Sequence, residues 1–499
     1  MFITQTDLAN KNIQIGAITA NSQALLDLIK EHSNSDAVTA MKDGANYYRV
    51  ENTAVNDTEF NQYNVYEFAG NDSSNNPTYT ATTKTNLHSK NIKKPSPLYR
   101  GGIIQKIDYG LSNGVVIEYP DNTTKDNIID TLGKTLDVKL SSLATEGANS
   151  AVSYLYVYID KKGQFKYMVM DSRELIIVYK DDTREEISEV IRYYPVETII
   201  DGSSTSKWII EIYSSDEKEV FEEQSNGLLT SQGISNYGLI KTTDNETEQP
   251  INWGKPPFVE FINNPERITD LQPVKCQIDD IDIQDSQLSN DFIDKPESLI
   301  NIHGFEGDNP ANLLEWMKTM GVTFTAGDDT GVSGIEIKIP YEGKQSVIDK
   351  TTKNVYKGMQ AVDTSTETVS KASSGVALEI MYKPLNSKVL RMYQGLTKSL
   401  YSLLSFVNIY YTLASKITGA KSMPQFDPTQ ASFVFTPDVV VNLTEIVEAA
   451  VKLSAIGYPI EKILDILPMV DSNNKQEILD LIEEQKVDLF QEPMTEDDT

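Results

Sequence analysis

The sequence predicts an α+β protein of several domains, and three features of its 499 residues support this class. Segments rich in β-branched and aromatic residues, typical of strands, dominate residues 150–260. At residue 269 the apolar residues begin to recur with the period of a helix. Helical patterns then continue to the end of the chain, around one small α/β insert at 297–341. A chain of this length is expected to form roughly two to four domains.

The N-terminal part is expected to begin with short helices at 21–42, followed by a loop-rich stretch at 43–85. An exposed polar loop is predicted at 71–86, where Asn, Asp, Ser and Thr accumulate. The predicted strands are 115–120, 153–160, 165–171, 175–180, 190–195 and 208–213. A hairpin turn at 160–163 ends in Gly163, which tolerates positive φ. A proline pair at 256–257 opens an edge strand.

From residue 269 onward the prediction is mainly helical. A first amphipathic helix covers about 270–293, with Pro273 in its first turn, and a second covers about 342–362. Between them lie expected strands at 298–304, 322–325 and 335–340, with a helix at 311–320 and a Gly-rich turn at 326–334. A short helix should break before Pro384, and a long one should cover about 386–417. Helices are also expected within 437–499, with a stop at Gly457 and an acidic tail.

The composition argues against several classes of protein. The net charge is −29, whereas a protein that grips nucleic acid by neutralising phosphates, or docks on an anionic membrane, needs a basic surface. The single cysteine, Cys276, excludes an intramolecular disulfide and a cysteine-based zinc cluster, and we interpret it as a small packing residue. No targeting signal is recognised at the start of the chain. The uncharged run 399–415 is short for a bilayer span and is expected to be a buried core helix.

Catalytic signals are weak. The three histidines, His32, His88 and His303, have no second His or Cys at the spacing of metal ligands. Gly133-Lys134-Thr135 ends like a phosphate-binding loop, but the glycine required five residues earlier is Ile128. These patterns predict neither a zinc enzyme nor an ATPase.

Two charged helices are more informative. Asp279, Asp282 and Asp285 belong to a dense acidic cluster on the first helix, which is either a solvated or inter-subunit face or a metal-dependent hydrolase site. Lys350, Lys353 and Lys357 share one face of the second helix, which is net positive. Opposite charges on two helices that flank one insert suggest that these helices lie side by side, within or between subunits. Two independently solvated faces are the alternative.

The segment 363–375 is rich in Ser and Thr and joins two predicted helices, where a compact domain normally uses a short turn. It is either a linker or a functional mobile loop.

Several blocks of the chain, in order and spacing, resemble the portal proteins of tailed bacteriophages, in the subgroup common among phages of Gram-positive hosts. These blocks are LYRGGIIQKID at 98–108, GVVIEYPD at 114–121, the strand region 153–179, IRYY at 191–194, WGKPPFVEFINN at 253–264, the Asp-rich helix and SSGVAL at 373–378. The match covers most of the chain. It differs mildly from the family at the block 114–121 and in the polarity of 71–95.

The resemblance implies a portal fold assembled as a ring, usually of twelve copies. The implied parts are a mixed α/β wing at 1–265, a stem helix at 266–296, a small α/β clip at 297–341, a second stem helix at 342–362, a tunnel loop at 363–375, a further wing part at 376–436 and a helical crown with an acidic tail at 437–499.

The implied function is a channel for double-stranded DNA at one capsid vertex, without enzymatic activity or cofactor. The implied partners are other copies of the chain, the terminase large subunit, a head-tail adaptor, and the major capsid and scaffolding proteins, with no membrane; assembly would occur in the host cytoplasm and the product would reside in the virion. An acidic metal-dependent hydrolase and another capsid or tail adaptor remain alternatives.

Candidate site residues follow from the same assignment. The DNA-facing loop residues would be Thr364, Ser365, Thr366, Thr368, Ser370, Lys371 and Ser373. The channel charges would be Lys350, Lys353, Lys357, Asp279, Asp282 and Asp285. The clip residues that contact the motor or adaptor would be Glu315, Trp316, Lys318, Asp328 and Asp329.

Overall fold

The fold is described from a computed structural model. The described residues are 3–11, 13, 22–87, 89–160, 162–200, 203–224, 227–237, 239–241, 248–294, 298–303, 316–317, 322–325, 331–336, 340–365, 375–414, 423–438, 443–464, 467, 470, 475 and 478–482. The chain divides into two compact units. The first comprises Met1–Asp363 and Pro384–Asp438, and the second comprises Thr364–Lys383 and Val439–Thr499.

A six-stranded sheet forms one part of the first unit, in the order β1-β7-β8-β9-β10-β11. Its strands are β1 (Ile3–Thr4), β7 (Leu175–Tyr179), β8 (Ile187–Ile200), β9 (Ser203–Tyr213), β10 (Glu217–Glu223) and β11 (Leu229–Asn236). All neighbours are antiparallel except β1 and β7. Helix α2 (Ser22–Ser33) packs Leu25 and Leu28 into a core with Ile191 and Ile210 of the sheet. The expected antiparallel region is therefore confirmed.

A second sheet has three antiparallel strands in the order β14-β5-β6. These strands are β14 (Phe258–Ile262), β5 (Val152–Ile159) and β6 (Phe165–Met170). Gly163 in the turn before β6 has φ +76°, as the sequence predicts. Helix α7 (Leu136–Ser150) packs on this sheet, and Gly147 permits the approach, since a Cβ there would lie 2.5 Å from the Phe261 ring.

The first unit also contains several shorter elements. They are α1 (Gln5–Asn10), α3 (Asp36–Tyr48), α4 (Thr53–Asn56), α5 (Leu98–Leu111), α6 (Asn122–Leu132), η2 (Ser172–Glu174) and η3 (Pro428–Gln430), with the strand pairs β4 (Val115–Glu118) with β18 (Ser432–Phe435) and β12 (Leu239–Lys241) with β13 (Glu248–Pro250). Gly133 separates α6 from α7 with φ +74°, so the lysine and threonine after it lie in a helix-to-helix turn.

The loop predicted at 71–86 is wrong. Residues on both sides of a short turn form a hairpin of β2 (Gln62–Asn71) and β3 (Pro77–Thr85). Asp72 organises the turn, because its Oδ1 accepts hydrogen bonds from the amides of Ser74 and Asn76, at 2.9 and 2.8 Å. The polar composition therefore belongs to an exposed ribbon, whose threonines favour strands as much as turns.

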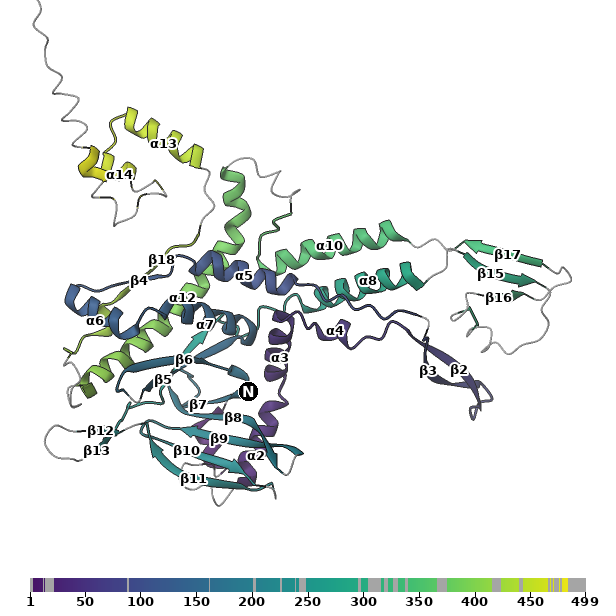
Figure 1. Ribbon diagram of the computed structural model, residues 1–499, viewed down its shortest axis with the longest axis horizontal. Coiled ribbons are helices and arrows are strands. Elements are labelled where there is room, and N and C mark those ends of the chain that lie inside the picture. The colour runs from purple at the N-terminus through teal and green to yellow at the C-terminus, as the bar shows by residue number, and fades with distance from the viewer. Residues whose placement is uncertain are drawn as a thin grey trace, which may run out of the picture. The chain divides into compact units, whose positions relative to one another are not determined.

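Two long helices flank a small sheet, as expected. Helix α8 (Lys275–Asp294) leads to strands β15 (Ser298–His303), β16 (Val322–Thr325) and β17 (Gly331–Glu336), and α10 (Tyr341–Met359) returns. Strand β15 is central, parallel to β16 and antiparallel to β17. Figure 1 shows α8 and α10 side by side, leading to this sheet.

Two boundaries and the exposure of one residue in this region differ from the predictions. Helix α8 begins at Lys275 rather than 270, because Thr269 Oγ1 caps a turn by accepting from the amide of Gln272, at 3.3 Å. Strand β17 starts at Gly331, inside the predicted Gly-rich turn. Cys276 is exposed rather than packed.

The prediction of a helix break at Pro384 is also wrong. Helix α12 (Gly375–Ala414) continues through this proline. It begins earlier than the long helix predicted at 386–417, and its described part ends at Ala414. Proline removes one backbone hydrogen bond from a helix interior. Beyond the proline the helix is held by packing, because Leu385, Val389 and Leu396 are at most 1% exposed. Within the same helix, the run 399–414 also buries Leu403 and Phe406, so the predicted core helix is confirmed there.

The second unit contains the first turns of α12, together with α13 (Leu443–Ala455) and α14 (Ile460–Leu464). Gly457 lies between these two helices with φ +78°, as its predicted role as a helix stop requires. Across the described part of the chain, none of the helices combines the length and the apolar character needed to cross a bilayer.

A buried ion network joins the helices of the first unit, and the sequence did not predict it. Asp270 Oδ2 lies 3.0 Å from the Nζ atoms of both Lys106, on α5, and Lys388, on α12. Asn263 donates to the other carboxylate oxygen, at 2.8 Å, and accepts from Lys106, at 2.6 Å. Lys388 also donates to the carbonyl of Met359 at the end of α10, at 2.8 Å. The two lysines hold the pKa of Asp270 well below its usual range, although burial opposes this shift.

We expect Asp270→Asn to destabilise the first unit by about 3–5 kcal/mol, because it leaves the buried Lys106 and the half-buried Lys388 without a counter-charge. Unfolding in guanidinium, followed by the fluorescence of the buried Trp253, measures the change. Asp280→Asn, on the exposed side of α8, is the matched control and should change stability little. A variant Asp270→Asn as stable as this control would contradict the role of the network.

We also expect acidification to weaken the packing of α2. His32 is 6% exposed, its Nδ1 lies 2.8 Å from the Tyr193 hydroxyl, and burial lowers its pKa to about 4. Because the unfolded chain binds this proton near pH 6.5, stability should fall by up to about 3 kcal/mol between pH 6.5 and 4. Unfolding midpoints measured across this range test the effect, and His32→Gln should flatten the curve. The same slope in that variant would contradict it.

Candidate nucleic-acid interface

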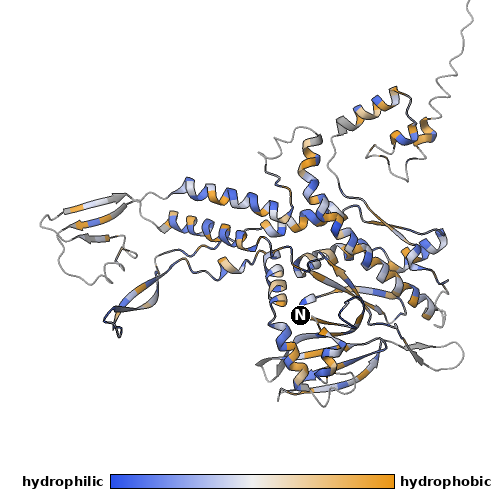
Figure 2. Ribbon diagram, turned by 180° about the vertical axis from the view of Figure 1, so that it is seen from behind, coloured by the Kyte–Doolittle hydropathy of each residue, from blue (hydrophilic) through white to orange (hydrophobic). Residues whose placement is uncertain are grey.

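The candidate interface is built on the antiparallel pair of α8 and α10. At one end of the pair, a Cβ placed on Gly358 would lie 2.6 Å from Val274, so only glycine allows this approach. At the other end, Lys344 forms an ion pair with Asp291 at 3.1 Å. The expectation that the two oppositely charged helices lie side by side is thus confirmed within one chain. Figure 2 shows that both helices are largely hydrophilic along their length.

Asp279, Asp282 and Asp285 of α8 contact the N-terminal part of the chain rather than α10. We define the arm as residues 50–96, which contain α4 and the β2–β3 hairpin. Asp279 accepts a hydrogen bond from Tyr47, just before the arm, and pairs with Lys275 at 3.1 Å. Asp285 pairs with Lys94 at 2.7 Å.

Asp282 is the most deeply placed of these carboxylates, with 1% exposure. It accepts hydrogen bonds from the Asn52 side chain and, at 2.9 Å, from the amide of Ser96. Burial raises its pKa, and the hydrogen bonds from the arm only partly offset this shift. Asp282 therefore lies inside the molecule and does not face a channel in the described structure, unlike the sequence-based expectation.

The arm is attached to α8 by a ladder of three backbone hydrogen bonds. The amides of Ser96, Lys94 and Ile92 donate to Asp282 Oδ1, Ser286 Oγ and Asn290 Oδ1, each at 2.9 Å. The three acceptors recur every four residues, on one stripe of the helix, while the donors recur every second residue of an extended segment. Asn290 also donates to the carbonyl of Ile92, at 2.9 Å. The polar residues of α8 thus substitute for a neighbouring strand.

A metal site is not formed by this acidic cluster. Asp279, Asp282 and Asp285 each bind different protein partners. Within the described ranges, no group of three or more His, Cys, Asp or Glu side chains is placed to hold an ion. The geometry gives no support to the alternative of a metal-dependent hydrolase at these residues.

The lysines of α10 lie on a face that the described residues leave exposed. Lys350, Lys353 and Lys357 are exposed and recur at three and four residues, which places them on one side of the helix. No ion pair engages them among the described residues. They line an open hollow of the same helix together with uncharged polar groups such as Gln345 and with the carboxylates of Glu342 and Asp349.

The other predicted site residues are described only in part. Thr364 and Ser365 are exposed, at the start of the second unit. Thr366, Thr368, Ser370, Lys371 and Ser373 lie outside the described residues. Of the clip residues, Trp316 is described as half-buried, whereas Glu315, Lys318, Asp328 and Asp329 lie outside the described residues.

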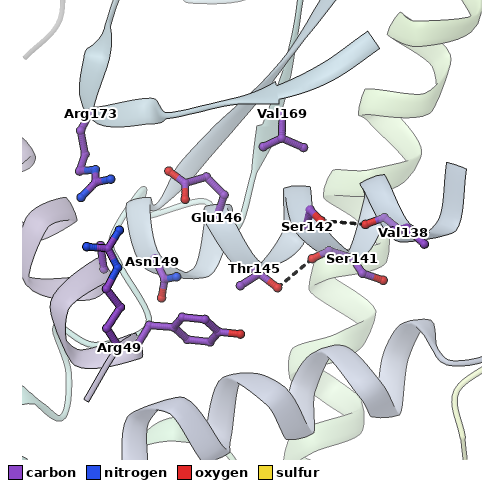
Figure 3. A pocket seen from close by; sticks show the side chains of 11 residues that line it. Arg49, Val138, Ser141, Ser142, Thr145, Glu146, Asn149, Val169 and Arg173 are labelled. Carbon is purple, nitrogen blue, oxygen red and sulfur yellow. Dashed lines mark hydrogen bonds between the residues drawn. The ribbon is translucent and has the colours of Figure 1, made fainter. Parts of the chain in front are cut away.

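A second polar hollow lies between α3, α7 and β6, and sequence reasoning missed it (Figure 3). Arg49 and Arg173 reach it from two segments, and Ser141, Ser142 and Thr145 line it from α7. Arg173 is engaged by Asp171, and burial raises the pKa of the nearby Glu146. The lining residues come from distant parts of the chain, so no local sequence pattern identifies the hollow.

The family profile and the two sequence relatives agree on one family. The profile of the phage portal proteins described as SPP1 Gp6-like matches residues 26–488. The portal protein of Bacillus phage SPP1 is 27% identical over 428 residues, which cover 85% of this chain and 78% of the relative. The portal protein of Clostridium phage phiCD119 is 26% identical over 297 residues, 57% of this chain and 64% of the relative. A solved structure titled as the neck of a native GTA particle, computed with C12 symmetry, covers 77% of this chain and 90% of its own, with 11% identity and a TM-score of 0.33.

We expect Asp282→Ala to release the arm from α8, because the amide of Ser96 and the Asn52 side chain lose their buried acceptor. Loss of such a partner costs about 1–3 kcal/mol. Hydrogen–deuterium exchange should become faster at Ser96, Lys94 and Ile92. Asp280→Ala is the control, since the described contact of Asp280 is with Gln284 on the same helix. Equal exchange of the arm in both variants would contradict the ladder.

Proposed function

Because this chain belongs to the phage portal protein family described as SPP1 Gp6-like, we propose that its paired helices line a channel for double-stranded DNA in a ring of twelve copies. Members of this family are structural components of the virion at the capsid, form oligomeric rings and associate with the capsid and the terminase. The proposal extends this to named parts and residues of the chain.

In this proposal the wing comprises 1–265 and 376–436, and the stem comprises the segments 266–296 and 342–362, which contain α8 and α10. The clip at 297–341 would dock the terminase large subunit and then the head-tail adaptor. The crown at 437–499 would face the capsid interior, near the major capsid and scaffolding proteins during assembly in the host cytoplasm. The antiparallel helix pair that flanks a three-stranded sheet supports this division.

The single observation that carries the proposed DNA contact is the distribution of charge on the two helices. Asp279, Asp282 and Asp285 of α8 are engaged by the chain's own arm and by Lys275, whereas Lys350, Lys353 and Lys357 remain exposed on α10. Engagement of Asp279, Asp282 and Asp285 makes them poor partners for the lysines of a neighbouring copy. The lysine face is therefore available to a polyanion.

A few lysines in an acidic ring suit the passage of DNA. Every phosphate that a protein neutralises adds affinity through counterion release, so a wall dense in cations would hold DNA in place. Sparse lysines centre the duplex by weak, exchangeable contacts, and the surrounding acidity keeps it from adhering. The Ser/Thr-rich loop at 363–375 would add hydroxyl contacts without fixed charge.

We expect Lys353→Glu to lower the amount of packaged DNA per particle while rings still assemble, because it places a negative charge where the duplex passes. Native mass spectrometry measures the ring, and nuclease-protected DNA measures packaging. Lys134→Glu, an equally exposed site on the turn before α7, is the charge-matched control. Failed ring assembly in Lys353→Glu alone would instead place this lysine at a contact between copies.

A further inference from the structure

The β2–β3 hairpin exposes an aromatic face that no described residue covers. Tyr66, Phe68 and Tyr79 are 59%, 63% and 60% exposed. The strand register places Phe68 opposite Tyr79 and Tyr66 opposite Ala81, so these four side chains share one face of the ribbon. The Phe68 and Tyr79 rings meet edge to face, with centroids 6.1 Å apart. Three such side chains provide several hundred Å² of apolar surface, an amount typical of interaction sites.

An isolated two-stranded ribbon is marginally stable in water. On the opposite face of this hairpin only Val65 is buried, at 1% exposure, while Glu67 and Thr80 remain exposed. The ladder to α8 fixes the segment that follows the hairpin, but it does not reach the aromatic face. The segment that follows the ribbon is therefore attached to α8, while the apolar side of the ribbon has no partner among the described residues.

A second uncovered apolar patch lies at the end of the helix pair nearest the three-stranded sheet. Phe292, Ile293, Tyr341 and Val347 are 45–55% exposed. Phe292 and Tyr341 belong to different helices, and their rings meet with centroids 5.9 Å apart. Beside this patch Asp291 and Lys344 form an ion pair, whereas Glu342 is exposed in the first turn of α10. We call these four residues the helix-end patch.

The charge of the chain indicates what occupies these surfaces. Copies that each carry −29 repel one another, so they can meet stably only where the local charge is small. The aromatic face bears no charged residue from Gln62 to Phe68 or from Tyr79 to Thr85, and the four side chains of the helix-end patch are themselves uncharged. Two different apolar patches on one chain are what a head-to-tail contact in a closed ring requires, since each copy donates one and accepts with the other.

We propose that the aromatic face of the β2–β3 hairpin of one copy docks on the helix-end patch of the next copy around the ring. The inference rests on the proposed ring and specifies a contact within it. The occupant is a second copy of this chain, and the arm ladder on α8 holds the hairpin ready to reach it.

Cross-linking of the full-length chain tests the contact. In a Cys276→Ser background, Tyr79→Cys is combined with Val347→Cys, and a short bismaleimide is added to assembled rings. Denaturing gels should then show a ladder of covalent multimers well beyond dimers, because each chain joins both neighbours. Thr80→Cys with Val347→Cys is the matched control, since Thr80 lies on the opposite face of the ribbon, and it should give at least tenfold less product.

The outcomes separate the contact from the ring itself. Intact rings with no ladder, or a cross-link confined to single chains, would overturn the docking while leaving the proposed function in place. Absence of rings from the Cys276→Ser parent in native mass spectrometry would instead contradict the proposed function. If a cysteine pair prevents folding, Phe68→Cys with Tyr341→Cys provides a second pair. As an independent measure, Tyr66→Ser with Tyr79→Ser should lower ring stability in denaturant, and Glu67→Gln should not.

Discussion

The buried carboxylate of Asp270 is the constraint on which the arrangement of the first unit depends. It lies directly before α8, it binds lysines of α5 and α12, and one of these lysines also holds the last carbonyl of α10. A single charge thus joins four helices. Taking charges out of water is costly, and the cost is recovered only when every partner is in place. The orientation of the helix pair relative to the sheets is therefore specified by a polar contact, while the apolar contacts around it supply most of the stability.

Charge is segregated across the helix pair. Asp279, Asp282 and Asp285 of α8 contact the arm or Tyr47 just before it, through amides, a lysine and a tyrosine, and Lys350, Lys353 and Lys357 of α10 are exposed. Net charge alone argued against a protein that binds nucleic acid tightly. The structure adds that part of this acidity is engaged inside the fold, while these lysines lie at the surface beside Glu342 and Asp349.

The sequence predicted the elements whose signals are local and periodic. The change of apolar period at residue 269, the two helices around the insert and the strands of the two sheets are all of this kind. It failed where distant partners decide the outcome. Pro384 is carried within a helix because the residues that follow it are packed, and Asp282 is buried because Asn52 and Ser96, far away in sequence, bind it. The hairpin was not predicted because its polar residues occur in turns as well as in strands. The pairing of β2 with β3, which places Phe68 opposite Tyr79, is seen only in the structure.

The ladder between α8 and the arm has a built-in limit of length. Four residues of a helix advance about 6.0 Å, whereas two residues of an extended segment advance about 6.6 Å. The two repeats are nearly commensurate, so three rungs fit with a total mismatch of roughly 1 Å, which small tilts of the side chains absorb. Each added rung would increase the error until the hydrogen bonds failed. Among the described side chains of α8, the ladder extends from Asp282 to Asn290. A polar stripe on a helix can thus serve as a ruler, setting how far an extended segment follows it before the chain must turn away.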